Sequence, residues 1–328
     1  MQSTMLRGVI ALLLALLLTQ CSSGPMSGSW SGRTAQLKEL GYVAVPLMKV
    51  SGDVRYSGVF KVNEVPLRFL IDSGANSTDM EDHLATRVGL KRSQSLSVVT
   101  RGALGREVRS GLGQGSLQVG PMKANDFPFT IAPPRQGETA TSRYAGQVGL
   151  DALNATGSLV DIPKGRLWVP GPKSSRTSLN GVRPLGPNPR LGKIMLEMGT
   201  AGQLPHLILH GTVNGQHVSW VVDTGAEISV MDAGSFQKLG LPSVMTNSRM
   251  IDASGDRVAL RRSRMKNLRF GAVNVRTFDI AIAPLTEVKH FFKDEKGRPV
   301  DGILGMDFLI NGKALLDSGS KILYMGKP

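Results

Sequence analysis

Two aspartates stand in the same short motif and could form one acid–base site. Asp72 lies in Phe-Leu-Ile-Asp-Ser-Gly-Ala, and Asp223 lies in Trp-Val-Val-Asp-Thr-Gly-Ala, 151 residues further along the chain. A carboxyl group that ends an apolar strand is partly desolvated, which raises its pKa, and a second carboxyl nearby raises one pKa further and lowers the other. Such a pair shares one proton. Its ionised member can deprotonate water while its neutral member donates to a peptide carbonyl, so the motif predicts peptide hydrolysis without a covalent intermediate.

The residues after each aspartate suit a supporting loop. Their hydroxyl side chains can lock the two loops together, and their glycines supply backbone amides that no side chain shields. We assign the supporting loops to Ser73, Gly74, Ala75, Thr224, Gly225 and Ala226.

Two diverged copies of one fold must position the motifs. At the offset of 151 residues, Val62-Asn63 meets Val213-Asn214, and downstream Val148–Leu153 matches Leu304–Leu309 at an offset of 156, as loop insertions would produce. Short β-branched apolar runs separated by Gly, Asn and Asp predict a mainly β chain. Only two short helices are predicted, over Glu81–Val88 and Ala233–Leu239. The clearest predicted strands are Val43–Val50, Leu67–Ile71, Leu207–Val213, Val218–Val222 and Ile322–Met325.

These motifs resemble the aspartic peptidases of the retropepsin and pepsin group. Besides Asp-Ser/Thr-Gly-Ala, the second copy has the turn Asn214-Gly215 and the terminal signature Asp301–Leu309. The resemblance covers most of residues 55–170 and 205–326. It implies two acid-protease β-barrel lobes related by a pseudo-two-fold axis, with Asp72 and Asp223 as a dyad in a cleft that takes an extended peptide.

The resemblance also implies a hairpin that folds over the substrate in each lobe. Its counterparts are about Val98–Val108, with Gly102 and Gly105 at the tip, and Met250–Leu260, with Ser254 and Gly255 at the tip. Because one chain carries both aspartates, we expect a monomer that forms an intramolecular pseudo-dimer and needs no cofactor. The alternative is a dimer in which lobe two pairs with lobe two of another molecule and lobe one is a stabilising cover.

The first copy departs from the family pattern. Asp79 stands where the second copy has Val230, and a carboxylate there is costly if it is buried. Val148-Gly149 is also a poorer version of Leu304-Gly305. We therefore expect that the loop in lobe one is more open or has another task, and that lobe one is catalytically degraded. The alternative function is a non-catalytic peptide-binding envelope lipoprotein that kept the protease fold.

The N-terminal segment resembles a bacterial lipoprotein signal. Arg7 precedes the apolar run Val9–Leu18, and Cys21, the single cysteine, follows it. Gln20 departs from the usual small residue, so an ordinary signal peptide and an uncleaved anchor are the alternatives. We expect lipidation of Cys21 and a location on the periplasmic side of the cell envelope. The predicted organisation is signal peptide 1–21, tether 22–40, lobe one 41–170, Pro/Gly-rich linker or crossing strap 171–192, and lobe two 193–328.

The remaining charged residues predict no further site. The net charge of +14 could suggest nucleic acid, which an exported protein rarely meets. The basic cluster Arg261–Arg264 is interpreted as a solvated strand or loop surface, with anionic envelope lipid as a weaker alternative. His206 and His210 flank Leu207–Leu209 without a carboxylate or cysteine close in sequence. They predict a surface strand pair and no metal site.

Overall fold

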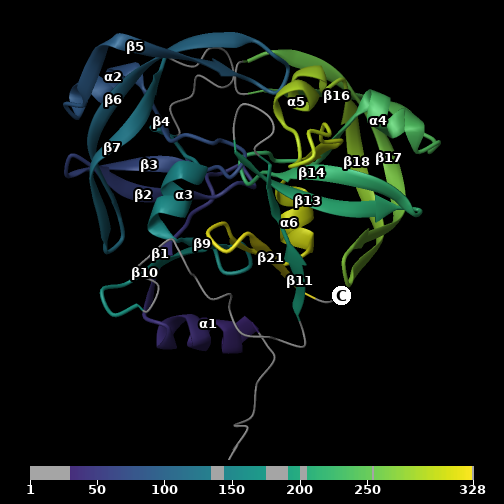
Figure 1. Cartoon of the computed structure of the whole chain (residues 1–328), viewed down its shortest axis with the longest axis horizontal. Helices are drawn as coiled ribbons and strands as arrows, with labels where there is room; N and C mark the ends of the chain where they lie inside the picture. The colour runs from purple at the N-terminus through teal and green to yellow at the C-terminus, as the bar shows by residue number, and fades with distance from the viewer. Residues whose placement is uncertain (1–29, 134–143, 175–190, 200–204, 253–254, 327–328) are drawn as a thin grey trace, which may run out of the picture.

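The short apolar runs form strands that are arranged in three sheets. The structure is a computed structural model, and it describes residues 30–133, 144–174, 191–199, 205–252 and 255–326. Within these residues the fold is mainly β, as predicted, with one large sheet in each lobe and a third sheet that both lobes share (Figure 1).

The sheet of lobe one contains the strand that leads into Asp72. Its strand order is β2 (Ser57–Val62), β3 (Val65–Ile71), β8 (Gly146–Val148), β4 (Asp79–Glu81), β7 (Met122–Ala132), β6 (Glu107–Val119) and β5 (Lys91–Arg101). The sheet of lobe two contains the strand that leads into Asp223. Its strand order is β12 (Glu197–Gly199), β13 (His206–Val213), β14 (Gln216–Val222), β19 (Gly302–Leu304), β15 (Val230–Asp232), β18 (Val273–Ala283), β17 (Arg257–Phe270) and β16 (Val244–Ile251).

The shared sheet joins the lobes edge to edge. Its order is β1 (Tyr42–Pro46), β10 (Arg166–Pro170), β9 (Leu159–Asp161), β20 (Leu315–Asp317), β21 (Ile322–Gly326) and β11 (Leu191–Met195). Three strands come from each half of the chain, and β9 pairs with β20 in antiparallel fashion, Val160 opposite Leu316. This arrangement has the pseudo-two-fold symmetry that the internal repeat predicts.

Large apolar side chains fill the interior of both lobes. Phe60, Phe69 and Phe129 are fully buried in lobe one, and Trp220 and Phe270 are fully buried in lobe two. Burial of each such side chain contributes about 1.5–3 kcal/mol. The hydrophobic core thus packs against both strands that lead into the aspartates.

Each aspartate follows a strand that is paired on both sides. β3 pairs in parallel with β8, and β14 pairs in parallel with β19. The amide of Asp72 donates to the carbonyl of Val148 at 3.0 Å, and the amide of Asp223 donates to that of Leu304 at 2.9 Å. The two copies therefore fix their aspartates by the same backbone contact.

The structure has more helix than we predicted. The two predicted helices are present as α2 (Asp82–Arg87) and α4 (Ala233–Lys238). Four others among the described residues were not predicted: three of them have only six or seven residues, fewer than two turns, and the fourth is polar. They are α1 (Trp30–Glu39), α3 (Leu150–Thr156), α5 (Thr286–Phe291) and α6 (Met306–Asn311).

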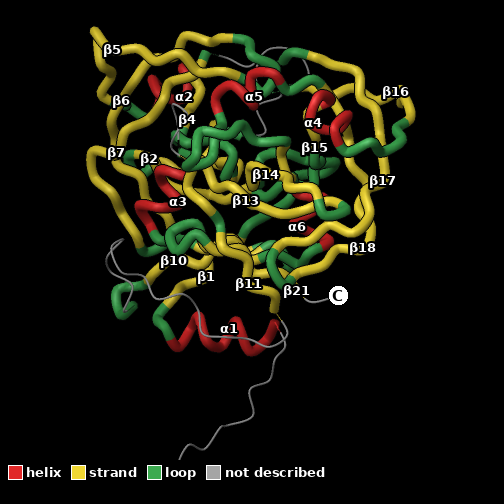
Figure 2. Tube along the Cα trace, turned by 45° about the vertical axis from the view of Figure 1, so that its right-hand side comes forward, coloured by secondary structure: helices red, strands yellow, loops and turns green. Residues whose placement is uncertain are grey.

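Helix α1 occupies part of the segment that we interpreted as a tether. It lies below the shared sheet in Figures 1 and 2. Leu37 is fully buried and clusters with Leu159, Trp168 and Leu315 of that sheet. Residues 22–29 of the predicted tether, Cys21 and most of 171–192 lie outside the described residues. Among the described helices, none combines the length and the apolar character that crossing a bilayer requires.

Candidate active site

The carboxyl groups of Asp72 and Asp223 face each other across the boundary between the lobes. A Cβ atom added to Gly74 would lie 2.3 Å from Cγ of Asp223, and one added to Gly225 would lie 2.3 Å from Cγ of Asp72. Each carboxyl thus packs directly on the backbone of the opposite loop. The absence of a side chain at both glycines is what allows the two carboxyls to meet.

The environment of this pair favours one retained proton. The surrounding protein desolvates Asp223 and raises its pKa well above the usual range, and the charge of Asp72 and the hydrogen bond between the two side chains raise that pKa further. The nearby amides only partly oppose these effects. Oδ1 of Asp72 accepts from the amides of Gly74 (2.9 Å) and Ala75 (3.0 Å), and Oδ1 of Asp223 accepts from the amides of Gly225 (2.7 Å) and Ala226 (3.1 Å).

Ser73 and Thr224 tie the two loops together. The Ser73 hydroxyl donates to the carbonyl of Val222 at 2.8 Å, and the Thr224 hydroxyl donates to the carbonyl of Ile71 at 2.8 Å. Each hydroxyl also accepts the backbone amide of the other residue. Both side chains are buried. This reciprocal set holds the two aspartate loops in one fixed register.

A second pair of contacts ties each loop to a helix later in the same lobe, α3 in lobe one and α6 in lobe two. In lobe two, the Ser229 hydroxyl donates to Asp307 at 2.6 Å and accepts from the amide of Gly305 at 2.9 Å. In lobe one, the Thr78 hydroxyl donates to Asp151 at 2.7 Å and accepts from the amide of Gly149 at 3.1 Å.

The expectation of a degraded loop in lobe one is therefore wrong as regards its structural support. Thr78 takes the place of Ser229, and a hydroxyl is all that this contact requires. Asp79 is half-buried, and its Oδ1 accepts the amide of Gln147 at 3.1 Å, which offsets part of the cost of its burial. Both loops thus have the same contacts from a hydroxyl to a helix carboxylate and from a glycine amide to that hydroxyl.

Two further residues reach these loops from the opposite lobe, and neither contact was predicted from the sequence. Nη1 of Arg55 donates to the carbonyl of Gly225 at 3.2 Å, and Nε2 of His206 lies 3.1 Å from the carbonyl of Gly74. The prediction of a surface position for His206 is wrong, because the residue is only 1% exposed. The available signal was the spacing, since Arg55 and His206 are also 151 residues apart.

His210 has a carboxylate partner that the sequence did not reveal. Its Nε2 lies 2.6 Å from Oε2 of Glu197, which comes from the neighbouring strand β12. Asp294 completes a group whose potential ligand atoms lie within 4.8 Å of one another. The Asp294 carboxylate already accepts from the backbone and side chain of Arg298. Protein groups thus engage both carboxylates, whereas Nδ1 of His210 is buried and has no hydrogen-bond partner among the described residues.

Two hairpins meet above the site. The β5–β6 and β16–β17 hairpins rise on either side of α5 (Figure 2). At their tips, the amide of Leu104 donates to Asp252 at 2.9 Å, and Arg106 lies 3.9 Å from Asp256. Of the predicted tip residues, Gly102 and Gly105 lie in the first turn and Gly255 lies in the second, while Ser254 falls outside the described residues.

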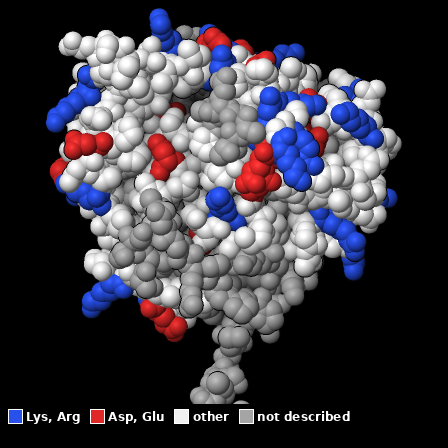
Figure 3. Space-filling model, in the orientation of Figure 1, with Lys and Arg blue, Asp and Glu red and all other residues white. Residues whose placement is uncertain are grey.

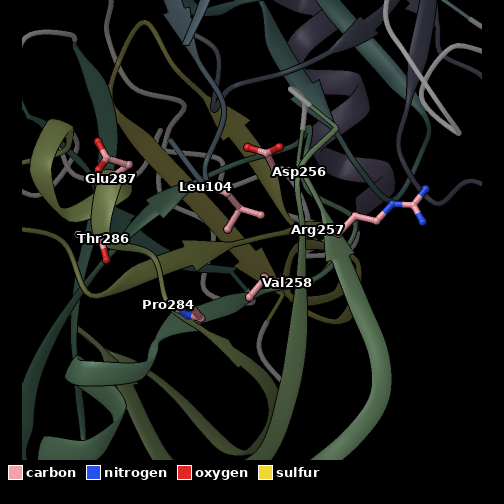
Figure 4. A pocket seen from close by; sticks show the side chains of 7 residues that line it. All are labelled: Leu104, Asp256, Arg257, Val258, Pro284, Thr286 and Glu287. Atoms are coloured by element: carbon pink, nitrogen blue, oxygen red, sulfur yellow. The ribbon is translucent and has the colours of Figure 1, made fainter. Parts of the chain in front are cut away.

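A pocket of about 400 Å³ lies where these hairpin tips meet α5. Figure 4 shows its lining side chains around a hollow, with Arg257 pointing away from it. Val258 also belongs to a hydrophobic cluster that includes Ala103 of the first hairpin and Ala226 of the aspartate loop. The pocket is lined by Leu104, Asp256, Arg257, Val258, Pro284, Thr286 and Glu287.

The basic cluster Arg261–Arg264 lies on a solvated strand, as we interpreted it. Arg262 and Arg264 are exposed on β17 and form ion pairs with Asp279, whose pKa their hydrogen bonds and charges lower to about 2. Figure 3 shows several basic side chains together over the region where β16 lies in Figure 1. The three arginines of this cluster are exposed on the surface of lobe two.

Comparison with known proteins agrees with this geometry. The aspartyl protease family matches the chain over residues 59–151 and 209–308, so each match contains one aspartate motif. No curated protein matches the chain. Among solved structures, the basic 7S globulin from soybean is similar, with a TM-score of 0.46 and 10% sequence identity, over 87% of this chain and 95% of that chain. The two family matches span more than half of the sequence, and the chain belongs to the retropepsin-like aspartyl protease family.

Proposed function

We propose that this protein is an aspartic endopeptidase in which Asp72 and Asp223 activate one water molecule. The observation that carries the proposal is the direct opposition of the two carboxyls across Gly74 and Gly225. The raised pKa of Asp223 supports it, because a pair that retains one proton supplies both an acid and a base.

The proposed reaction leaves the pair as it began. The ionised carboxylate takes a proton from the water as the water oxygen bonds to the peptide carbon, and the neutral carboxyl protonates the carbonyl oxygen. The resulting tetrahedral diol then loses its nitrogen. The carboxyl that gained the water proton donates it to the leaving nitrogen, and a diol hydroxyl returns a proton to the other carboxylate. A carboxylic acid and an amine are released.

We propose that the substrate is an extended peptide that binds between the lobes, beneath the hairpins. The pocket near Leu104 and Val258 offers an apolar wall close to the Ala226 loop, with Glu287 and Asp256 among its lining residues. We propose that it receives a substrate side chain on the lobe-two side of the cleft. Because the hairpin tips touch each other, at least one hairpin must move for the substrate to enter.

The proposed location is the periplasmic side of a bacterial envelope, with a lipid on Cys21. The support is the N-terminal sequence, in which a basic residue and an apolar run precede the single cysteine. Labelling with a radioactive fatty acid tests this in cells. Label that persists in a Cys21→Ser variant would contradict the anchor.

Peptide cleavage by the purified chain tests the activity. The full chain in mild detergent is incubated with denatured casein from acidic to neutral pH, and new peptide termini are identified by mass spectrometry. We expect cleavage by the wild type and none by Asp223→Asn. Peptide binding without cleavage by the wild type would instead support a non-catalytic peptide-binding protein.

A further inference from the structure

The two peptide groups that hold the aspartates have a second contact at their other end. The amide of Ala75 donates to Asp72 at 3.0 Å, and the carbonyl of the same peptide group, that of Gly74, lies 3.1 Å from Nε2 of His206. A peptide group is planar, so a contact that fixes its carbonyl also fixes the direction of its N–H. His206 thereby orients a donor to Asp72 although it does not touch that carboxyl.

Arg55 makes the matching contact in the other half of the site. The amide of Ala226 donates to Asp223 at 3.1 Å, and the carbonyl of Gly225 accepts from Nη1 of Arg55 at 3.2 Å. Each anchor therefore comes from one lobe and holds the aspartate loop of the other. A hydrogen bond at a carbonyl also polarises the peptide group and strengthens the bond that its N–H donates.

The two anchors differ in chemistry. Arg55 is held by Asp53 at 2.7 Å, and it also lies 3.4 Å from Glu227. Burial opposes its charge, but the Asp53 carboxylate outweighs burial and raises the pKa of Arg55. Asp53 in turn accepts from the hydroxyl of Tyr144 at 2.8 Å. This anchor is a permanent cation inside a hydrogen-bonded network.

His206 packs closely against an aromatic ring. Its ring lies 3.9 Å from the ring of Phe292, centroid to centroid, and the residue is almost wholly buried. A carbonyl oxygen can only accept a hydrogen bond, so Nε2 must carry the proton. A neutral imidazole can make this contact, and no charge is required of it.

We propose that His206 and Arg55 are positioning residues of the aspartate pair, each acting on the loop of the opposite lobe. The inference rests on the proposed peptidase function. Because each anchor comes from the opposite lobe, the N–H groups that donate to each carboxylate are correctly oriented only when the two lobes are correctly placed. A misplacement of about 1 Å at a reacting group can cost about 100-fold in rate, so small shifts of these peptide groups matter.

Substitution of His206 tests the proposal. Gln keeps a donor near the position of Nε2, whereas Leu has similar bulk and no donor. We expect His206→Leu to lower kcat by about 10- to 100-fold with KM within about twofold of the wild type. We expect His206→Gln to recover most of that loss. The matched control is His83→Leu, because His83 is exposed on α2 and should leave kcat unchanged.

Arg55 offers the companion test. Arg55→Lys keeps the cation and should retain more kcat than Arg55→Met, which removes the donor to Gly225. If His206→Leu fails to fold, His206→Asn replaces it, since the shorter amide cannot reach Gly74. Folded His206→Leu or His206→Asn protein with the kcat of the wild type would overturn the proposal.

A second measurement separates this inference from the proposed function. If the wild type cleaves no peptide, the peptidase proposal fails, and the anchors are judged by the ¹³C carboxyl titrations of Asp72 and Asp223 by NMR. Titrations that shift in His206→Leu and not in His83→Leu would support the positioning role. Titrations that match the wild type in both variants would overturn it.

Discussion

Ser73 and Thr224 exchange backbone and side-chain hydrogen bonds across the boundary between the lobes. The amide of Ser73 donates to Oγ1 of Thr224 at 2.9 Å, and the amide of Thr224 donates to Oγ of Ser73 at 3.0 Å. Neither loop can complete its own hydrogen bonds without the other lobe. The loops that carry Asp72 and Asp223 therefore depend on each other and form one structural unit.

Removal of the Ser73 hydroxyl should destabilise the whole fold. Ser73→Ala leaves the buried amide of Thr224 without its acceptor and the carbonyl of Val222 without its donor. A buried group left unpaired costs about 1–3 kcal/mol, so we expect a loss of that size in the free energy of unfolding, measured by urea titration. Ser95→Ala, at an exposed position on β5, is the control and should change it by less than about 0.5 kcal/mol. Equal stabilities of the two variants would contradict this prediction.

A methyl group at Gly74 should abolish activity. The new Cβ would lie 2.3 Å from Cγ of Asp223, so either the carboxyl or the loop must move. We expect Gly74→Ala and Gly225→Ala each to lower kcat/KM at least 100-fold, because the carboxyl pair is displaced. Gly111→Ala is the matched control, since its Cβ would meet only Ile131 at an ordinary 3.7 Å. Full activity of Gly74→Ala would show that the two carboxyls do not pack as described.

The raised pKa of Asp223 should reduce stability at neutral pH. A carboxyl with a raised pKa binds more protons in the folded state than in the unfolded state, so the free energy of unfolding falls as pH rises from the usual aspartate range through the raised pKa. Asp223→Asn should therefore be more stable than the wild type at pH 7, and the difference should vanish near about pH 3, where both are uncharged at this position. Thermal unfolding at both pH values measures this, and a variant that is less stable at pH 7 would contradict it.

Asp252 should control the contact between the hairpin tips. Its carboxylate accepts from the amide of Leu104 at 2.9 Å and from that of Asp256 at 3.0 Å. In Asp252→Ala we expect faster hydrogen exchange at both amides, measured by NMR, because both lose their acceptor. Lys91→Ala, at the far end of the first hairpin, should leave the exchange unchanged. Equal hydrogen-exchange rates in the wild type and Asp252→Ala would show that this contact does not control the opening of the tips.

The repeat in the sequence was sufficient to predict the fold class and the opposition of the two motifs. It also suggested that lobe one was degraded, because Asp79 and Val148 depart from the pattern of the second copy. That expectation relied on identical residues in the two copies. The loop depends instead on a hydroxyl at the position of Thr78 and a carboxylate at Asp151. Both are present, and the chemistry of the contact is conserved between the lobes although the local sequence is not.

The cross-lobe anchors could not be found in the same way. Arg55 and Gly225 are 170 residues apart, and the pairing depends on how the two lobes are placed. Arg55 and His206 occupy equivalent positions in the repeat, but their side chains differ, so a search for identical residues passes over them. Helix α1 was not predicted for another reason. Its Ser, Gly and Thr residues are typical of a tether, and its buried Leu37 packs against the shared sheet only once the chain has folded.

The most direct test of one dyad in one chain is the kcat/KM of Asp72→Asn beside that of Asp223→Asn, with a peptide that the wild type cleaves. We expect each variant to retain its fold and to lose at least 1,000-fold in kcat/KM, because each removes one half of the acid–base pair. We also expect no recovery when the two variants are mixed, since both aspartates must come from the same chain. Wild-type activity of Asp72→Asn, or activity restored by mixing, would contradict the account.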